Sequence, residues 1–284
     1  MTTTAIPTEA RLTFGGILRS EWIKLVTLRS TVWCYVILVG LTVGIGALIG
    51  AVMSGADGAF GPSTPEGVQS TWLMTATAGA AFAQLVMAVL GAMVITGEYG
   101  TGMIRSTFAA VPRRVPALVG KVLVFGVVSF LVALLALVLS ALLAVPLLAG
   151  NGLAVDPADP AIWLGLIGAA AFVALIGLMA LGIGAIIRNT AAAIAATLGL
   201  LLVLPSVMQL LGVLTRAEWA MNATALLPSS AGSQLSSYPS EPVQLPPDVF
   251  QPLVLEPLQA LLVLAAWALV PLVVGGALLK RRDT

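Results

Sequence analysis

Six long apolar runs, separated by short polar segments, dominate the pattern of this 284-residue chain. A helix needs roughly 20 mostly apolar residues to cross a hydrocarbon core about 30 Å thick. The runs that meet this requirement are Val32 to Met53, Leu73 to Thr96, Leu118 to Leu148, Ala161 to Ile187, Ala191 to Leu214 and Leu258 to Leu279. Pro205 predicts a kink in the fifth run. Because the runs are continuous, they disfavour the short alternating strands of a membrane barrel and predict an all-α polytopic membrane protein with six transmembrane helices.

An amphipathic segment precedes the first run. Wound as a helix, "RLTFGGILRSEWIKLVTLRS" places Phe14, Ile17, Leu18, Trp22, Leu25 and Leu28 on one face. Ser20, Lys24 and Thr27 lie opposite, which is typical of a helix in the headgroup layer of a membrane. Glu21 falls inside the apolar face, where an unpaired carboxylate is costly, so we expect it to find a donor. Lys24, one turn on, and a basic residue from another cytoplasmic segment are the two candidates.

A second short amphipathic segment, "GEYGTGMIRSTFAAVPRR", separates the second and third runs. Thr101 can cap a short helix there, and Pro112 would end it. Apolar side chains recur at helical spacing at Ile104, Phe108 and Val111. The basic pair Arg113 and Arg114 follows. The pattern alone leaves two interpretations open, a loop held to anionic lipid by its arginines and a docking element for a partner protein.

The basic residues set the predicted orientation. If the N-terminus is cytoplasmic, six spans place 12 of the 13 lysines and arginines on the cytoplasmic side and only Arg216 outside. The cytoplasmic set is Arg11, Arg19, Lys24, Arg29, Arg105, Arg113, Arg114, Lys121, Arg188, Lys280, Arg281 and Arg282. This bias predicts a multi-pass protein of the cell membrane with both termini cytoplasmic.

The chain is expected to divide into three parts. Residues 1–31 form a cytoplasmic tail and the interfacial helix, 32–279 form the six-helix transmembrane domain, and 280–284 form a second cytoplasmic tail. Within the transmembrane domain, 97–117 is the cytoplasmic loop described above, and 215–257 is a long extracytoplasmic loop rich in proline and serine in its second half.

Composition supports the membrane assignment and limits the chemistry. The chain is 59% hydrophobic and 9% charged, with a mean hydropathy of +1.07. It has no histidine, and Cys34 is its single cysteine, so no catalytic residue and no metal site is predicted. The only Gly-Lys pair, Gly120-Lys121, is followed by Val122 and does not form a phosphate-binding loop. We therefore expect no enzymatic activity in this chain and no nucleic-acid partner.

The segment "GEYGTGMIRSTFAAVPRR" resembles the connection between the second and third spans of type-2 ABC transporter permeases, the export class. Glu98, Gly100, Thr101, Pro112 and Arg113 occupy the places of that pattern, while Gly102 stands where a bulkier residue is common. "SEWIKLVTLRS" also resembles the amphipathic entry helix of the family, especially of its actinobacterial members. The resemblance covers all six spans in order and spacing, and it is specific in these two segments.

The resemblance implies a permease subunit of an ABC exporter. In that family two permease subunits surround a translocation path, and a short cytoplasmic coupling helix inserts into each of two separate ATPase subunits, which carry the ATP and Mg. The implied coupling residues are Glu98, Gly100, Thr101, Ile104, Arg105, Phe108, Val111, Pro112 and Arg113. A re-entrant segment would precede the last span. The second subunit would be another copy of this chain or a paralogue.

The family places the second and fifth spans at the centre of the dimer. We therefore expect a substrate path lined by Phe82, Gln84, Met87, Met208 and Gln209, for which helix packing is the alternative role. The cargo would be hydrophobic or amphipathic, such as a drug, a lipid or a peptide. The alternative functions are a channel, a membrane-embedded enzyme, or a sensory or immunity component without a transport cycle of its own.

Overall fold

The computed structural model describes residues 13–54, 64–103, 114–150, 152–215, 218–239 and 253–281. Every regular element in these ranges is a helix. The elements are α1 (Phe14–Thr27), α2 (Arg29–Ser54), α3 (Pro65–Thr77), α4 (Ala80–Gly100), α6 (Arg114–Ala149), α7 (Pro160–Ile187), α8 (Thr190–Leu198), η1 (Gly199–Val203), α9 (Leu204–Thr215), α10 (Glu218–Ala225), α11 (Pro228–Leu235) and α12 (Pro257–Arg281).

Six helical segments in the described ranges are long and apolar enough to cross a membrane, which confirms the predicted number. They are Arg29–Met53, Pro65–Gly100, Val115–Ala149, Pro160–Ile187, Thr190–Thr215 and Pro257–Leu279. Four are single helices, whereas the second consists of α3 and α4 and the fifth of α8, η1 and α9.

The second span differs from its prediction at its start. Helix α3 begins at Pro65 instead of near Leu73, because Thr64 caps it by accepting a hydrogen bond from the Gly67 amide at 3.2 Å. The helix is then interrupted between α3 and α4. At this interruption a β-carbon on Gly79 would lie 2.4 Å from the Thr42 Cα, so only glycine lets the chain pass this close to α2.

The fifth span shows what Pro205 does. A proline has no N–H to donate to the carbonyl four residues earlier, which here belongs to Leu201. The helix widens directly before it into the π-helical turn η1, where the Leu204 amide donates to Gly199. The Leu201 carbonyl instead accepts a hydrogen bond from the Ser229 hydroxyl of α11 at 3.2 Å. Where Pro205 predicts a kink, the structure shows a π turn that is hydrogen-bonded to α11.

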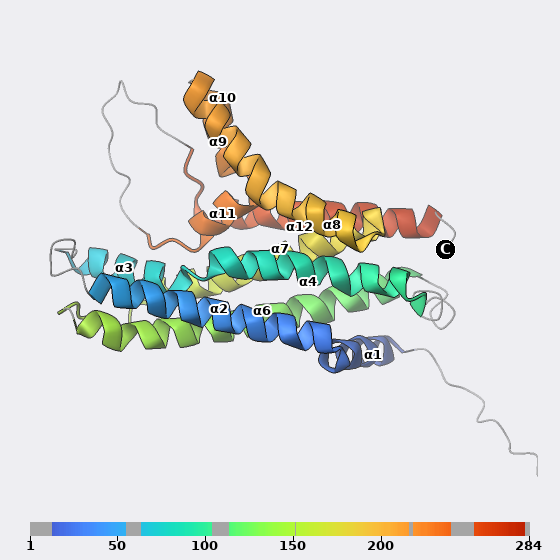
Figure 1. Cartoon of the computed structure of the whole chain (residues 1–284), viewed down its shortest axis with the longest axis horizontal. Coiled ribbons are helices and arrows are strands. Elements are labelled where there is room, and N and C mark those ends of the chain that lie inside the picture. The colour runs from blue at the N-terminus through green and yellow to red at the C-terminus, as the bar shows by residue number, and fades with distance from the viewer. Residues whose placement is uncertain are drawn as a thin grey trace, which may run out of the picture.

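Helix α7 is the centre of the bundle and the most buried of the six spans. It packs against α4, α12 and α6, while α2 packs on α6 (Figure 1). A β-carbon on Gly91 of α4 would lie 2.1 Å from the Gly177 carbonyl of α7, so the two backbones are in contact. The fifth span is the least buried of the six.

The ends of the helices are segregated along the bundle. Figure 1 shows α1, the first turns of α2 and α6, the last turn of α4 and the end of α12 together at one end of the molecule. We call this the basic end, because Lys24, Arg29, Lys121 and Arg188 belong to the segments that meet there. Helices α3, α10 and α11 lie toward the opposite end (Figure 1). The first and last described helices therefore share one end, as an even number of spans requires.

The predicted extracytoplasmic loop contains the two short helices α10 and α11. Helix α11 packs against α7 and α12, and its Ala231 and Gly232 are buried. Whether this segment re-enters a membrane stays a prediction, and residues 240–252 lie outside the described ranges.

Candidate functional site

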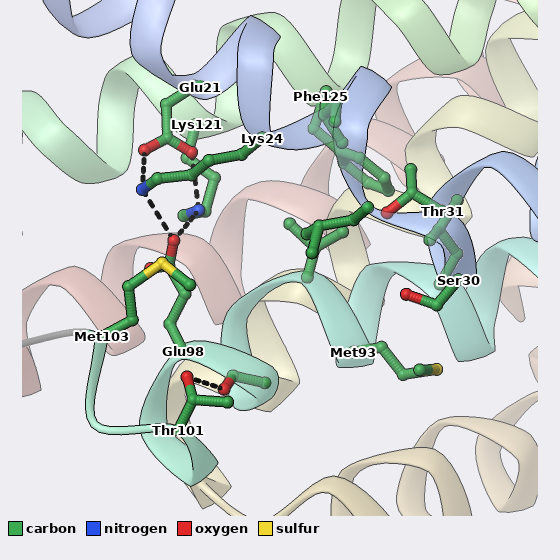
Figure 2. Close-up of a pocket in the computed structure, with 15 residues that line it drawn as sticks. Glu21, Lys24, Ser30, Thr31, Met93, Glu98, Thr101, Met103, Lys121 and Phe125 are labelled. Atoms are coloured by element: carbon green, nitrogen blue, oxygen red, sulfur yellow. Dashed lines mark hydrogen bonds and ion pairs between the residues drawn. The ribbon is translucent and has the colours of Figure 1, made fainter.

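Four charged side chains meet at the basic end. Helix α1 contributes Glu21 and Lys24, α4 contributes Glu98 from its last turn, and α6 contributes Lys121 from its first turns. The Lys24 Nζ atom lies 2.7 Å from Glu21 Oε1 and 2.8 Å from Glu98 Oε1. The Lys121 Nζ atom lies 2.6 Å from Glu21 Oε2 and 2.9 Å from Glu98 Oε1. Figure 2 shows the four groups pointing toward one another, and we call them the ion-pair cluster.

The cluster is buried and electrically balanced. Glu21, Glu98 and Lys121 are each 4–5% exposed, and two carboxylates face two ammonium groups. Burial by itself lowers the pKa of Lys24, but its hydrogen bonds to Glu21 and Glu98 and their negative charges raise that pKa above its ordinary value. Lys24 is therefore charged at neutral pH. Such a buried cluster holds its helices together mainly because separating them would leave a buried charge without its partner, which costs free energy.

Local sequence explains how α1 reaches the cluster. Thr13 caps α1 by accepting a hydrogen bond from Gly16, and Ile17, Glu21 and Leu25 then recur every four residues on its buried face. Helix α1 packs on α6, where a β-carbon on Gly120 would lie 2.7 Å from Ile17.

Both candidate donors for Glu21 are present. Lys24 is one, and Lys121 is the basic residue from another segment. Lys24 does not stay on the polar face where the pattern placed it, because its long side chain turns inward to Glu98. The remaining predicted interfacial residues do not belong to the ion-pair cluster. Phe14 and Trp22 are 46% and 51% exposed, and Leu18 is half-buried.

Thr101 and Gly102 form the end of α4. Thr101 is the C-cap of α4, and its hydroxyl donates back to the Gly97 carbonyl at 2.9 Å. Its role as the cap of a following helix stays a prediction, because residues 104–113 lie outside the described ranges. Gly102 follows with a φ of +72°, a left-handed conformation that suits glycine and stops the helix. The chain therefore turns sharply just beyond Glu98.

Most of the predicted coupling residues cannot be placed. Ile104, Arg105, Phe108, Val111, Pro112 and Arg113 lie outside the described residues. Of the other three, Glu98 belongs to the ion-pair cluster, and Gly100 and Thr101 are exposed at the end of α4.

The five predicted path residues are not brought together as one surface within a single chain. Met87 is fully buried, and its methyl group would lie 2.5 Å from a β-carbon on Gly177, so it packs in the core. Gln84 is buried and accepts a hydrogen bond from Ser229 of α11 at 3.0 Å. Phe82 and Gln209 are exposed and Met208 is half-buried.

Sequence reasoning missed a second feature of the basic end. Arg188 ends α7 in the left-handed region at φ 59°, and its guanidinium lies 5.1 Å from the centre of the Tyr99 ring. Nearby, the Thr190 hydroxyl donates to Thr96 at 2.9 Å and joins α8 to α4. An arginine and an aromatic 89 positions apart give no local pattern, so only the fold reveals this contact.

In the part of the chain that the structure describes, no three His, Cys, Asp or Glu side chains gather closely enough to hold a metal ion. Models of known protein families and the sequences of curated proteins give no match to this chain.

Proposed function

We propose that the chain is the membrane-spanning permease subunit of an ABC exporter. Two permease subunits, either two copies or this chain with a paralogue, surround a path for a hydrophobic or amphipathic substrate. Separate ATPase subunits bind and hydrolyse ATP.

The observation that carries the proposal is the ion-pair cluster. Glu98 stands at the start of the segment that resembles a coupling helix, and both Lys24 of the entry helix and Lys121 of the third span bind it. A force applied to that segment by an ATPase would therefore reach α1, α4 and α6 together. A loop whose only task is to hold anionic lipid needs no such buried connection to two other helices.

The fifth span is consistent with a second permease subunit. It is the least buried of the six spans, whereas the second and fourth spans pack closely together through α4 and α7. Gln209, a polar residue, is exposed on it, and Phe82 is 47% exposed on the second span. A second subunit facing these two spans would enclose a path with apolar walls and a few hydrogen-bonding groups. Gln84 and Met87 would support that wall from behind.

Co-purification tests the docking step. The tagged chain is expressed together with each candidate ABC-type P-loop ATPase from its own genome and is extracted from membranes. We expect Ile104→Asp to release the ATPase, because a charge in an apolar cleft is costly to desolvate. Ile104→Leu, which keeps the side chain apolar, should retain it. Retention by the Asp variant at the parental level would refute the docking assignment.

A further inference from the structure

We propose that a cavity beside the ion-pair cluster binds an uncharged amphiphile through a hydroxyl head group. The cavity has a volume of about 230 Å³ and lies between the α1–α2 connection, α4 and α6. It is distinct from the proposed substrate path, since none of the five path residues lines it. The inference does not depend on the chain being a transporter.

The cavity wall is chemically divided. Leu25, Leu28, Leu90, Val94 and Phe125 form an apolar part. Glu21, Lys24, Glu98 and Lys121 form a charged part, and Figure 2 shows the cluster on one side of the cavity and Phe125 on the other. A ligand that fills this space therefore needs an apolar body with one polar end.

Among the described residues, Glu98 has a buried oxygen without a hydrogen-bond partner at the charged part of the wall. Both lysines donate to Glu98 Oε1, whereas Glu98 Oε2 is buried and forms no hydrogen bond within the described ranges. A buried carboxylate oxygen without a donor costs free energy, so a ligand that donates to it gains affinity.

The balance of charge selects the type of donor. Two carboxylates already neutralise two ammonium groups, so an ammonium or a carboxylate ligand would leave a net charge in a poorly solvated place. A hydroxyl group donates to Glu98 Oε2 without adding charge. It can also accept from a lysine, since each ammonium has three N–H groups and makes two of the hydrogen bonds described above.

The size of the cavity argues against water as the sole occupant. A water molecule takes up about 30 Å³ and needs two to four polar partners, which the apolar part of the wall does not offer. An apolar cavity of about 150 Å³ in another protein holds benzene, so this larger one can hold the tail of a medium-chain alcohol.

Photolabelling tests the site directly. The full-length protein in phosphatidylcholine nanodiscs is irradiated with octanol that carries a diazirine in its chain, and the labelled residues are mapped by mass spectrometry. We expect saturable labelling of cavity residues such as Leu90, Val94 and Phe125. Unlabelled octanol should compete, and octylamine and octanoate should compete about tenfold less well, as expected for burial of an uncompensated charge.

A matched pair of glycine variants controls for nonspecific labelling. Gly97 lines the cavity, and a β-carbon there would meet no heavy atom within 4 Å, so Gly97→Leu should fold and occupy the space. Gly40, on α2 and outside the cavity, is equally free to accept a side chain. We expect Gly97→Leu to abolish the saturable labelling and Gly40→Leu to leave it unchanged.

Three results would overturn the proposal. They are labelling that is not saturable, labelling that survives in Gly97→Leu, and equal labelling by a diazirine octane that lacks the hydroxyl. The last result would show that the apolar wall alone binds the probe. None of these results bears on whether an ATPase docks, so the site and the proposed function fail separately.

Discussion

At the residue scale, Glu98 and Lys121 offer the sharpest test of the cluster because both are about 95% buried. We expect Glu98→Gln to lower the free energy of unfolding by about 3–5 kcal/mol, since it leaves two lysines with one carboxylate. The double variant Glu98→Gln/Lys121→Met should cost less, because it leaves the Glu21–Lys24 pair intact. Thermal unfolding in detergent measures both.

The exposed Glu218 supplies the control, and Glu218→Gln should change stability by less than about 0.5 kcal/mol. Lys121→Met is also measured alone. If the loss of stability in the double variant equals the sum of the losses in Glu98→Gln and Lys121→Met, the two residues are not coupled and the cluster does not act as a unit.

The sequence contains a partial signal for this cluster. On the predicted topology eight of the 12 acidic residues fall in the extracytoplasmic loops, so Glu21 and Glu98 stand out in the cytoplasmic segments next to spans. For Glu21 the apolar face of the helix predicts a buried carboxylate in need of a donor, and the structure confirms it. That Lys121 meets both acids depends on how α1, α4 and α6 pack, which no local pattern contains.

At the scale of the elements, glycines decide which helices approach closely. Gly79→Ala should destabilise the protein by about 1–3 kcal/mol, because the added methyl group would lie 2.4 Å from the Thr42 backbone, which cannot easily move. Gly40→Ala adds the same group where nothing lies within 4 Å and should be neutral or slightly stabilising. Unfolding temperatures of the two variants check this, and equal temperatures would contradict the close approach of α4 and α2.

The elements also show what hydrophobicity can predict. Length and apolarity suffice for all six spans, because a membrane imposes both on every spanning helix. They do not reveal the interruption at Gly79, because the glycine is needed there for a close contact with Thr42, which is distant in sequence. Pro205 predicts an irregular fifth span, but neither the π turn before it nor the hydrogen bond from Ser229 to the Leu201 carbonyl can be read from the local sequence.

At the scale of the whole molecule, the shared end of α1 and α12 makes orientation testable (Figure 1). In a background with Cys34 replaced, single cysteines are placed at Ser63, Asp156 and Ser236 and at Thr4 and Asp283. A membrane-impermeant thiol reagent added from outside should modify the first three and spare the last two, because the positive residues stay in the cytoplasm. The opposite labelling pattern would contradict the predicted orientation and place both termini outside.

The central proposal is that ATP hydrolysis elsewhere drives this chain, and ATPase activity in reconstituted vesicles tests it most directly. The complex of permease and ATPase is measured against a panel of amphipathic compounds, with Phe108→Asp beside the conservative Phe108→Leu. We predict that at least one compound stimulates the parent and the Leu variant, while the Asp variant inserts into the membrane but does not respond. A chain that forms no complex with an ATPase, or an Asp variant stimulated as strongly as the parent, would contradict the proposal.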